Sequence, residues 1–219
     1  MAHNKLAIIG GGDLGRTLLR LLRDIPTYQF AGFLDDTLTN ATDKNESVLG
    51  CIGDAKRLNE EGAFDVAILA IGYSHMVARQ QIFDSLFQSG IKYATLVHPT
   101  ACIASDSEIE SGSVIFPGCT IDAGVRIRRN TVLNAGTVVS HDTSLGPHCF
   151  VGPGVVFAGF VHTGQRCRFG VGCTIHDNIA IGDDCQVASA SLVTRNIPPG
   201  QLVMGIPATR ISLTDWCQH

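Results

Sequence analysis

The chain repeats a six-residue pattern without interruption from Ile103 to Pro198. Cut every six residues, this stretch gives sixteen hexads: IASDSE, IESGSV, IFPGCT, IDAGVR, IRRNTV, LNAGTV, VSHDTS, LGPHCF, VGPGVV, FAGFVH, TGQRCR, FGVGCT, IHDNIA, IGDDCQ, VASASL and VTRNIP. The first position is large and apolar in fifteen of the sixteen hexads, with Thr163 as the exception, and the fifth holds only Ser, Cys, Thr, Val or Ile. A register kept over sixteen hexads restricts this part of the chain to a fold that stacks one small unit.

The period of the pattern predicts a triangular coil. Three hexads make one turn, and each hexad forms a short strand and a corner. The first-position side chain points inward, and the smaller fifth-position side chain fills the remaining space. Gly and Asn recur at the fourth position, where a corner favours a positive φ. Stacked coils pair like parallel strands, about 4.8 Å apart. The pattern therefore predicts a left-handed parallel β-helix of between five and six coils.

The repeat also accounts for most of the eight cysteines. Five of them stand at the fifth, inward position: Cys119, Cys149, Cys167, Cys173 and Cys185. A buried cysteine commonly behaves as a small hydrophobic residue, so we expect structural thiols here rather than disulfides. No spacing of His, Cys and Asp resembles a zinc site, and we expect no bound metal.

Charge and hydropathy argue against several classes of protein. The net charge is −4, the pI is about 6.0, and no run of Lys and Arg is longer than the pair Arg128-Arg129. These features argue against a nucleic-acid-binding surface. The apolar run Leu6–Ile9 is too short for a signal peptide or a membrane span. We therefore expect a cytoplasmic protein that binds neither nucleic acid nor membrane.

The first hundred residues show a different pattern, in which strands alternate with helices. Apolar runs predict buried strands at 5–10, 29–34 and 64–72 and a closing strand at 93–97, and helices are expected at 13–24 and at about 76–89. The type of the elements within 37–62 stays open. This alternation predicts a small parallel α/β sheet. We expect an α/β domain at residues 1–98 and the β-helix with a C-terminal tail at 99–219.

A glycine-rich loop joins the first expected strand to the first helix. Residues 10–15, GGGDLG, satisfy G-x-G-x-x-G, and Asp35 follows at the distance expected of the ribose-binding carboxylate. This fingerprint of dinucleotide binding suggests an NAD-dependent enzyme. However, only about 95 residues precede the coils, which is too few for the two halves of a complete dinucleotide-binding fold. We expect a half-Rossmann domain that holds one nucleotide, and a loop without any ligand is the alternative.

The two parts in this order resemble the sugar acyltransferases of the sialic acid O-acetyltransferase and UDP-N-acetylbacillosamine N-acetyltransferase family. Within it, the chain resembles GDP-perosamine N-acetyltransferase and related 4-amino-sugar enzymes. The resemblance covers nearly the full chain, and its marks are the Gly10–Gly15 loop, Phe33-Leu-Asp-Asp36, Ala70-Ile-Gly72, His98-Pro99, Asn134, Ser140-His-Asp142 and Met204-Gly-Ile-Pro-Ala208.

The resemblance implies specific roles for residues in both parts. In the α/β domain it implies contacts to the nucleotide of an activated sugar from Gly12, Asp13, Leu14, Asp35, Asp36 and Gly72. A plain solvated turn is the alternative role for Asp35 and Asp36. In the β-helix the resemblance implies substrate binding by Asn134 and acetyl-CoA binding by Gly159, Val171 and Ser189. Relatives often carry a histidine where this chain has Leu14, and one carries a histidine at the position of Phe150.

By the same resemblance, His141 is the catalytic base and Asp142 its partner. A neutral imidazole can take the proton that an amine loses when it attacks a thioester, and a carboxylate on the other ring nitrogen fixes the tautomer. His141 stands at the third position of its hexad, which points out of the coil. Gly159 and Asp177 follow at steps of three hexads in the same outer column. His162 and His176 are expected to face solvent.

The leading hypothesis is an acetyl-CoA-dependent N-acetyltransferase that acts on a nucleotide-linked amino sugar. The expected sugar is a 4-amino-4,6-dideoxyhexose for lipopolysaccharide or O-antigen synthesis. Direct transfer in a ternary complex is expected, because no Gly-x-Ser-x-Gly elbow suggests an acyl-enzyme. The family further implies a homotrimer with acetyl-CoA between adjacent subunits. O-acetylation of a sialic-acid-like sugar and a non-catalytic scaffold are the alternatives, and UDP, GDP and dTDP sugars all stay open.

Overall fold

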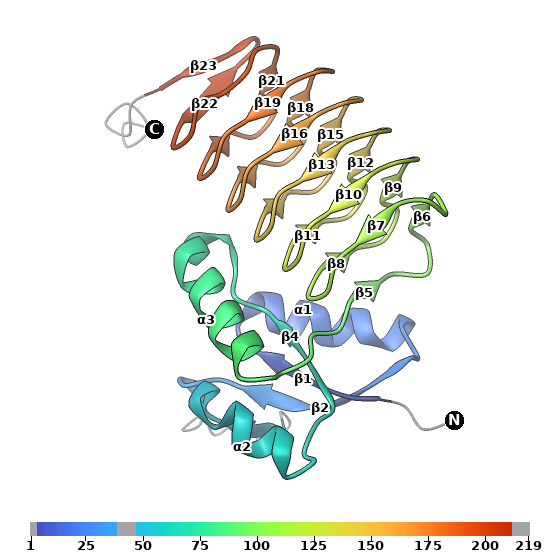
Figure 1. Ribbon diagram of the computed structural model, residues 1–219, viewed down its shortest axis with the longest axis vertical. Helices are drawn as coiled ribbons and strands as arrows, with labels where there is room; N and C mark the ends of the chain where they lie inside the picture. Colours follow the sequence, from blue (N-terminus) through green and yellow to red (C-terminus); the bar gives the residue numbers. More distant parts are fainter. Residues whose placement is uncertain (1–3, 39–46, 212–219) are drawn as a thin grey trace. The chain divides into compact units, whose positions relative to one another are not determined.

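The computed structural model describes residues 4–38 and 47–211 and forms two compact units, Met1–His98 and Pro99–His219. The first unit contains a parallel four-stranded sheet in the order β3-β2-β1-β4. Its strands are β1 (Asn4–Ile9), β2 (Tyr28–Leu34), β3 (Val48–Gly50) and β4 (Val66–Leu69), followed by the short strand β5 (Leu96–Val97). Its helices are α1 (Asp13–Leu21), α2 (Ala55–Glu60) and α3 (Met76–Gln88), with 3-10 turns at Leu22–Asp24, Ile52–Asp54 and Tyr73–His75 (Figure 1).

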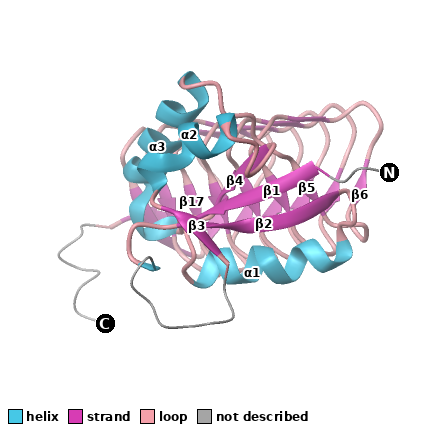
Figure 2. Ribbon diagram, turned by 90° about the horizontal axis from the view of Figure 1, so that it is seen from below, coloured by secondary structure: helices cyan, strands magenta, loops and turns pink. Residues whose placement is uncertain are grey.

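The two faces of this sheet pack against different helices. Alternate residues of the central strands, among them Ala7, Ile9 and Leu69, form a buried cluster with α2 and α3, in which Phe83 is fully buried. Helix α1 lies on the opposite face of the strands (Figure 2). Period-2 alternation in strands buried on both sides explains why their sequences are almost continuously apolar. The predicted parallel α/β fold is confirmed.

Two details of the first unit differ from the expectation or complete it. The strand expected at 64–72 covers only Val66–Leu69, since Gly72 already caps a 3-10 turn, and the strand expected at 93–97 covers only Leu96–Val97. The open segment 37–62 contributes strand β3 and helix α2. Part of that segment, residues 39–46, lies outside the described residues.

The second unit is the left-handed parallel β-helix that the hexads predict, and its coils are stacked in Figure 1. Each coil contributes one two-residue strand to each of three faces, and strands one coil apart pair at a spacing of three hexads. Face A carries β7 (Glu108–Ile109), β10 (Arg126–Ile127), β13 (Ser144–Leu145), β16 (His162–Thr163) and β19 (Ala180–Ile181). Face B carries β8 (Val114–Ile115), β11 (Val132–Leu133), β14 (Phe150–Val151), β17 (Arg168–Phe169) and β20 (Gln186–Val187).

Face C carries β6 (Cys102–Ile103), β9 (Thr120–Ile121), β12 (Val138–Val139), β15 (Val156–Phe157), β18 (Thr174–Ile175) and β21 (Leu192–Val193). An antiparallel hairpin, β22 (Leu202–Gly205) with β23 (Ala208–Arg210), extends face B by pairing with β20. No helix among residues 4–38 and 47–211 is both long and apolar enough to cross a membrane.

The hexad register matches the interior of the coils. Thirteen of the sixteen first positions are buried, and fifteen of the sixteen fifth positions are buried. The fourth position turns the chain, and it has a positive φ in fourteen of the sixteen hexads. Six of those fourteen residues are glycines, for which this conformation carries no steric penalty. The predicted corner position is therefore confirmed.

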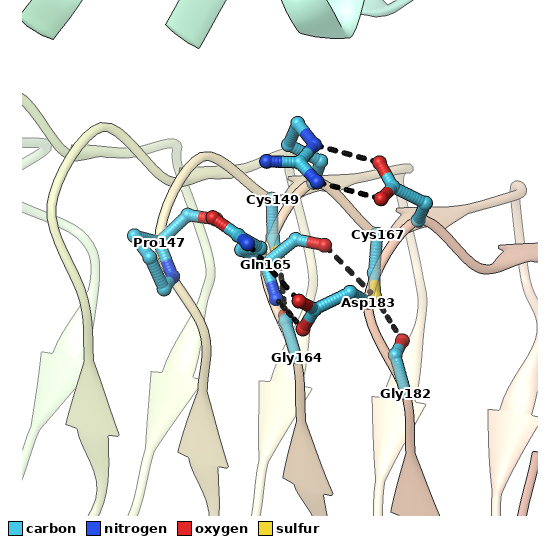
Figure 3. Close-up of polar contacts among 9 residues, drawn as sticks. Pro147, Cys149, Gly164, Gln165, Cys167, Gly182 and Asp183 are labelled. Atoms are coloured by element: carbon cyan, nitrogen blue, oxygen red, sulfur yellow. Dashed lines mark hydrogen bonds and ion pairs between the residues drawn. The ribbon is translucent and has the colours of Figure 1, made fainter. Parts of the chain in front are cut away.

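Hydrogen bonds from the fifth-position side chains tie each coil to the next. Their hydroxyl or thiol donates to a backbone carbonyl of the next coil, as Thr143 does to Ala158 at 2.9 Å. Cys149 donates to Gly164 at 3.3 Å, and Cys167 donates to Gly182 at 3.1 Å, the latter shown in Figure 3. The five inward cysteines are buried free thiols, and burial raises the pKa of Cys173 to about 12. They are structural residues, as expected.

Candidate functional site

His141 lies at the corner that joins face C to face A, between β12 and β13. Its Nδ1 is 3.0 Å from Oδ2 of Asp142, and about half of each side chain is exposed. Asp142 occupies the corner position with φ 58°, and this left-handed turn directs its carboxylate back to the neighbouring imidazole. With the proton on Nδ1 donated to Asp142, Nε2 carries a lone pair that can accept a proton.

Gly159 and Phe160 support His141 from the next coil. A Cβ placed on Gly159 would lie 2.7 Å from Cε1 and 2.8 Å from Nε2 of His141, so the imidazole packs directly against the glycine. The backbone N–H of Phe160 donates to the carbonyl of His141 at 3.1 Å. The Phe160 ring stands edge-on to the imidazole, with 5.1 Å between ring centres and an interplanar angle of 88°.

A second histidine–aspartate pair lies one coil beyond Gly159. Asn178 donates its backbone N–H to Gly159 at 3.0 Å, which puts Asp177 next in the outer column that starts at His141. Asp177 pairs with Nδ1 of His176 and accepts a hydrogen bond from the Asn178 amide at 2.7 Å. His176 is exposed, and so is His162, as expected.

The residues expected to bind acetyl-CoA lie along the edges of face C. Gly159 belongs to the edge of His141, whereas Val171 and Ser189 lie at the opposite edge, where face B meets face C. Val171 is 56% exposed, which is high for an aliphatic side chain, and its carbonyl accepts from Ala190 N–H at 2.8 Å. The outward side chains of face C between these edges are small and mainly apolar: Cys102, Thr120, Val138, Val156, Thr174 and Leu192.

Asn134 lies at that second edge and has a structural contact. Its side-chain amide donates to the carbonyl of Val151 on the next coil at 2.7 Å. Its own carbonyl accepts from the hydroxyl of Thr137 at 2.7 Å and from the thiol of Cys119 at 3.2 Å. Asn134 therefore joins two coils through its side-chain amide.

In the first unit, three loops meet at the carboxyl end of the sheet. β1 lies between β2 and β4, so the loops after these strands are neighbours: Gly10 N–H donates to Leu34 O, and Ala70 N–H donates to Ile9 O, both at 2.8 Å. Between β1 and β4 the direction of winding reverses, and open α/β sheets bind ligands at such a position. The structure thus brings Gly12, Asp35 and Gly72 to one edge.

The glycines of the fingerprint have separate tasks. Gly12 caps the N-terminus of α1, and Gly72 precedes the 3-10 turn after β4; a Cβ on either would meet no atom within 4 Å. Gly15 packs against the carbonyl of Gly10, where a Cβ would overlap it, and this contact brings α1 close to β1. Asp13 is exposed in the first turn of α1, and Leu14 is half-buried beside it.

Asp35 organises the loop edge rather than projecting freely from it. Oδ2 accepts from Gly11 N–H at 2.7 Å, and Oδ1 accepts from the N–H and hydroxyl of Thr37 at 2.7 and 2.6 Å and from Leu38 N–H at 3.1 Å. Partial burial raises the pKa of this carboxyl, but the hydrogen bonds outweigh that effect and hold the pKa below its usual value. Asp36 likewise accepts from Ile52 N–H at 2.8 Å.

Sequence reasoning missed Arg79. This arginine of α3 is fully buried, and its guanidinium donates to the carbonyl of Ile71 at 2.8 Å, so it holds the loop before Gly72. The signal was available, because Arg79 stands one helical turn before the buried Phe83 on the same stripe of the helix. A buried charge on an apolar stripe requires a structural or functional partner.

Residues that bind metals do not gather in the part of the chain that the structure describes. Within 4–38 and 47–211, no group of three or more His, Cys, Asp or Glu side chains could hold a metal ion. His148, which is near Phe150 in sequence, is buried at a corner, and its Nδ1 lies 2.9 Å from the side-chain nitrogen of Asn130. The imidazole of His148 therefore makes a structural contact inside the β-helix.

Residues 5–86 match the PglD N-terminal domain, 124–159 match the bacterial transferase hexapeptide, and 161–195 match the hexapeptide repeat of succinyl-transferase. No curated protein sequence matches the chain.

Two solved structures cover almost the whole chain. The acetyltransferase domain of PglB from Neisseria gonorrhoeae, in complex with acetyl coenzyme A, is 26% identical over 96% of this chain and 100% of its own, with a TM-score of 0.87. A variant of perosamine N-acetyltransferase from Caulobacter crescentus, in complex with CoA and GDP-perosamine, is 28% identical over 96% of this chain and 98% of its own, also with a TM-score of 0.87. The chain therefore carries a PglD N-terminal domain in front of transferase hexapeptide repeats, and over almost its whole length it is similar to acetyltransferases.

Proposed function

We propose that this protein transfers the acetyl group of acetyl-CoA to the amino group of a nucleotide-linked amino sugar, with His141 as the general base. The observation that carries the proposal is the His141–Asp142 pair, bonded at 3.0 Å and packed on Gly159, in a chain that matches acetyltransferases over almost its whole length. The solved relative from Caulobacter crescentus binds GDP-perosamine, which supports a 4-amino-4,6-dideoxyhexose as the sugar.

In the proposed mechanism the transfer is direct. The sugar amine attacks the thioester carbon, a C–N bond forms, and Nε2 of His141 takes the proton that the nitrogen must lose. Asp142 stabilises the resulting imidazolium through Nδ1–H. The tetrahedral intermediate then expels CoA as its thiolate, which receives the proton from His141. Every step uses groups of the two substrates and one His–Asp pair, and His141 returns to its neutral form.

Both substrates have proposed binding residues. The nucleotide would bind at the carboxyl end of the sheet in the first unit, near Gly12, Asp13, Leu14, Asp35, Asp36 and Gly72. The open space over Gly12 and the N-terminus of α1 suit a phosphate group. Acetyl-CoA would contact Gly159, Val171 and Ser189 along the two edges of face C, and Asn134 would contact the substrate through its side-chain oxygen.

The proposal includes a homotrimer in which acetyl-CoA lies between adjacent subunits. Face C supports it, because the outward residues of its central strands, Val138 and Val156, are apolar. Face A instead presents Glu108, Arg126 and His162, which suit contact with water. An apolar face beside the proposed base fits an interface that also holds a cofactor arm. A cytoplasmic location and a role in lipopolysaccharide or O-antigen synthesis follow from the proposed substrates.

A panel of acceptors tests the substrate class. Thiol release from acetyl-CoA is measured with 4-amino-4,6-dideoxyhexoses linked to UDP, GDP and dTDP, with the same sugars lacking the nucleotide, and with free sialic acid. The proposal predicts turnover of at least one nucleotide amino sugar and much weaker turnover of the sugar alone. Turnover of sialic acid without turnover of any amino sugar would establish the O-acetyltransferase alternative. Absence of thiol release with every acceptor would favour a scaffold.

A further inference from the structure

Phe160 is an unusual residue for a corner of this β-helix. It occupies the fourth position of its hexad with φ 58°, in the left-handed region. The other corners with positive φ carry glycine or one of Asn130, Asp142, His148, Arg166, Asn178, Asp184 and Ala190. Among the described corners, Phe160 is thus the one with a large apolar side chain at positive φ, and 45% of it is exposed.

This choice of residue has a conformational cost. A left-handed backbone is unfavourable for any residue with a Cβ, and most of all for a bulky one, whereas Gly, Asn and Asp adopt it readily. The fold does not require a bulky side chain here, since six glycines perform the same turn elsewhere in the β-helix. Such strain persists where the residue contributes something other than stability.

The contacts of Phe160 indicate what it contributes. Its ring stands at 88° to the imidazole of His141 with ring centres 5.1 Å apart, and its N–H bonds to the His141 carbonyl. Three residues thus contact the imidazole of His141. Asp142 bonds to Nδ1, Gly159 lies against the Cε1–Nε2 edge of the imidazole, and the Phe160 ring packs against the imidazole ring. About half of His141 is nevertheless exposed, and an imidazole with that much open space can rotate unless neighbours oppose it.

We propose that Phe160 is a positioning residue for His141: its ring opposes rotation of the imidazole and so preserves the bond from Nδ1 to Asp142 and the lone pair on Nε2. This inference rests on the proposed role of His141 as base. Phe160 itself transfers no proton. Its effect on the reaction is on kcat, because a correctly oriented base matters for the chemical step and not for capture of either substrate.

Three variants test the role. Phe160→Gly removes the ring and relieves the left-handed strain, and Phe160→Tyr keeps an aromatic ring. Asn178→Gly is the matched control, since Asn178 is the corner one coil further on, with φ 57°. We expect Phe160→Gly to lower kcat by about 10- to 100-fold with the KM of acetyl-CoA unchanged, as displacement of a catalytic group does. Its melting temperature should equal or exceed that of the unmodified protein. Phe160→Tyr and Asn178→Gly should retain kcat.

A measurement without turnover completes the test. Nitrogen-15 NMR of the histidine side chains reports which ring nitrogen of His141 carries the proton. In the unmodified protein and in Phe160→Tyr we expect the Nδ1–H tautomer, and in Phe160→Gly a mixture of both tautomers. Full kcat and an unchanged tautomer in Phe160→Gly would overturn the inference, as would a higher sugar KM at unchanged kcat, which would make Phe160 a binding residue. If Phe160→Gly gave either of these contradicting results while His141→Asn was inactive, the proposed function would stand and only the role of Phe160 would fall. An active His141→Asn would instead refute the assignment of the base.

Discussion

Gly159 lies so close to His141 that a single methyl group at residue 159 would stand 2.7 Å from Cε1 of the imidazole. The backbone of Gly159 does not have the positive φ that often explains a glycine, so its lack of a side chain is explained by space alone. The imidazole of His141 occupies the space that a side chain at residue 159 would fill. The two residues lie next to each other because they are three hexads apart, which puts them on adjacent coils.

Gly159→Ala is expected to displace the imidazole of His141 and to lower kcat by about 10²-fold, the size of effect that misplacement of a catalytic group has. The fold should tolerate the change, because residue 159 needs no left-handed conformation. Steady-state kinetics with both substrates measure the effect. Gly53→Ala is the control, since a Cβ there would meet no atom within 4 Å. Equal kcat in the two variants would contradict the contact seen here.

Asp35→Asn is expected to destabilise the protein by about 1–3 kcal/mol at neutral pH, because an amide cannot accept all the hydrogen bonds that the carboxylate receives. The hydrogen bonds hold the pKa of Asp35 below its usual value, although burial opposes them. Its stabilisation is therefore fully present above about pH 4, the ordinary range of an aspartate, and is lost as the pH falls through the lowered pKa.

Urea unfolding at pH 7 and at pH 3 measures this dependence on pH. The difference between the unmodified protein and Asp35→Asn should shrink at the lower pH. Asp106→Asn, a change at an exposed carboxylate of the β-helix, should show no such trend. A difference of the same size at both pH values would mean that the charge of Asp35 is not what stabilises the loop edge.

Val156→Glu is expected to dissociate the proposed trimer, because it puts a charge on the outer surface of face C, where burial in an interface would be costly. Light scattering coupled to gel filtration measures the mass, and thiol release measures the accompanying loss of activity. Ala180→Glu puts the same charge on face A, where the residue is exposed, and should leave both unchanged. A trimer that survives Val156→Glu would refute face C as the interface.

The repeat made the β-helix predictable in detail. First positions, fifth positions and corners all fall where the hexads put them, since each environment recurs in every coil and is sampled many times. Most strands and helices of the first unit were also predictable, but β3 and α2 were not, and the strands expected at 64–72 and 93–97 are shorter than expected. The columns of His141 with Gly159 and of Val171 with Ser189 follow from the same arithmetic.

What the sequence could not supply are contacts that depend on tertiary structure. Asp35 was expected to contact a nucleotide, and the sequence did not show that its carboxylate also accepts hydrogen bonds from Gly11, Thr37 and Leu38. The helical pattern puts Arg79 on the buried stripe of α3, but it does not show that the guanidinium donates to the carbonyl of Ile71. Phe160 stands out in the sequence as a large apolar residue at a fourth position, but its contact with His141 could only be seen in the structure.

The central claim is that His141 accepts the proton of the attacking amine, and the turnover of His141→Asn tests it most directly. Asparagine keeps a polar side chain of similar reach but cannot act as a base near neutrality. With a nucleotide amino sugar that the unmodified protein acetylates, kcat of the variant is expected to fall by about 10²- to 10⁴-fold, the usual contribution of a general base. The KM values should change little. A variant that keeps the kcat of the unmodified protein would contradict the account.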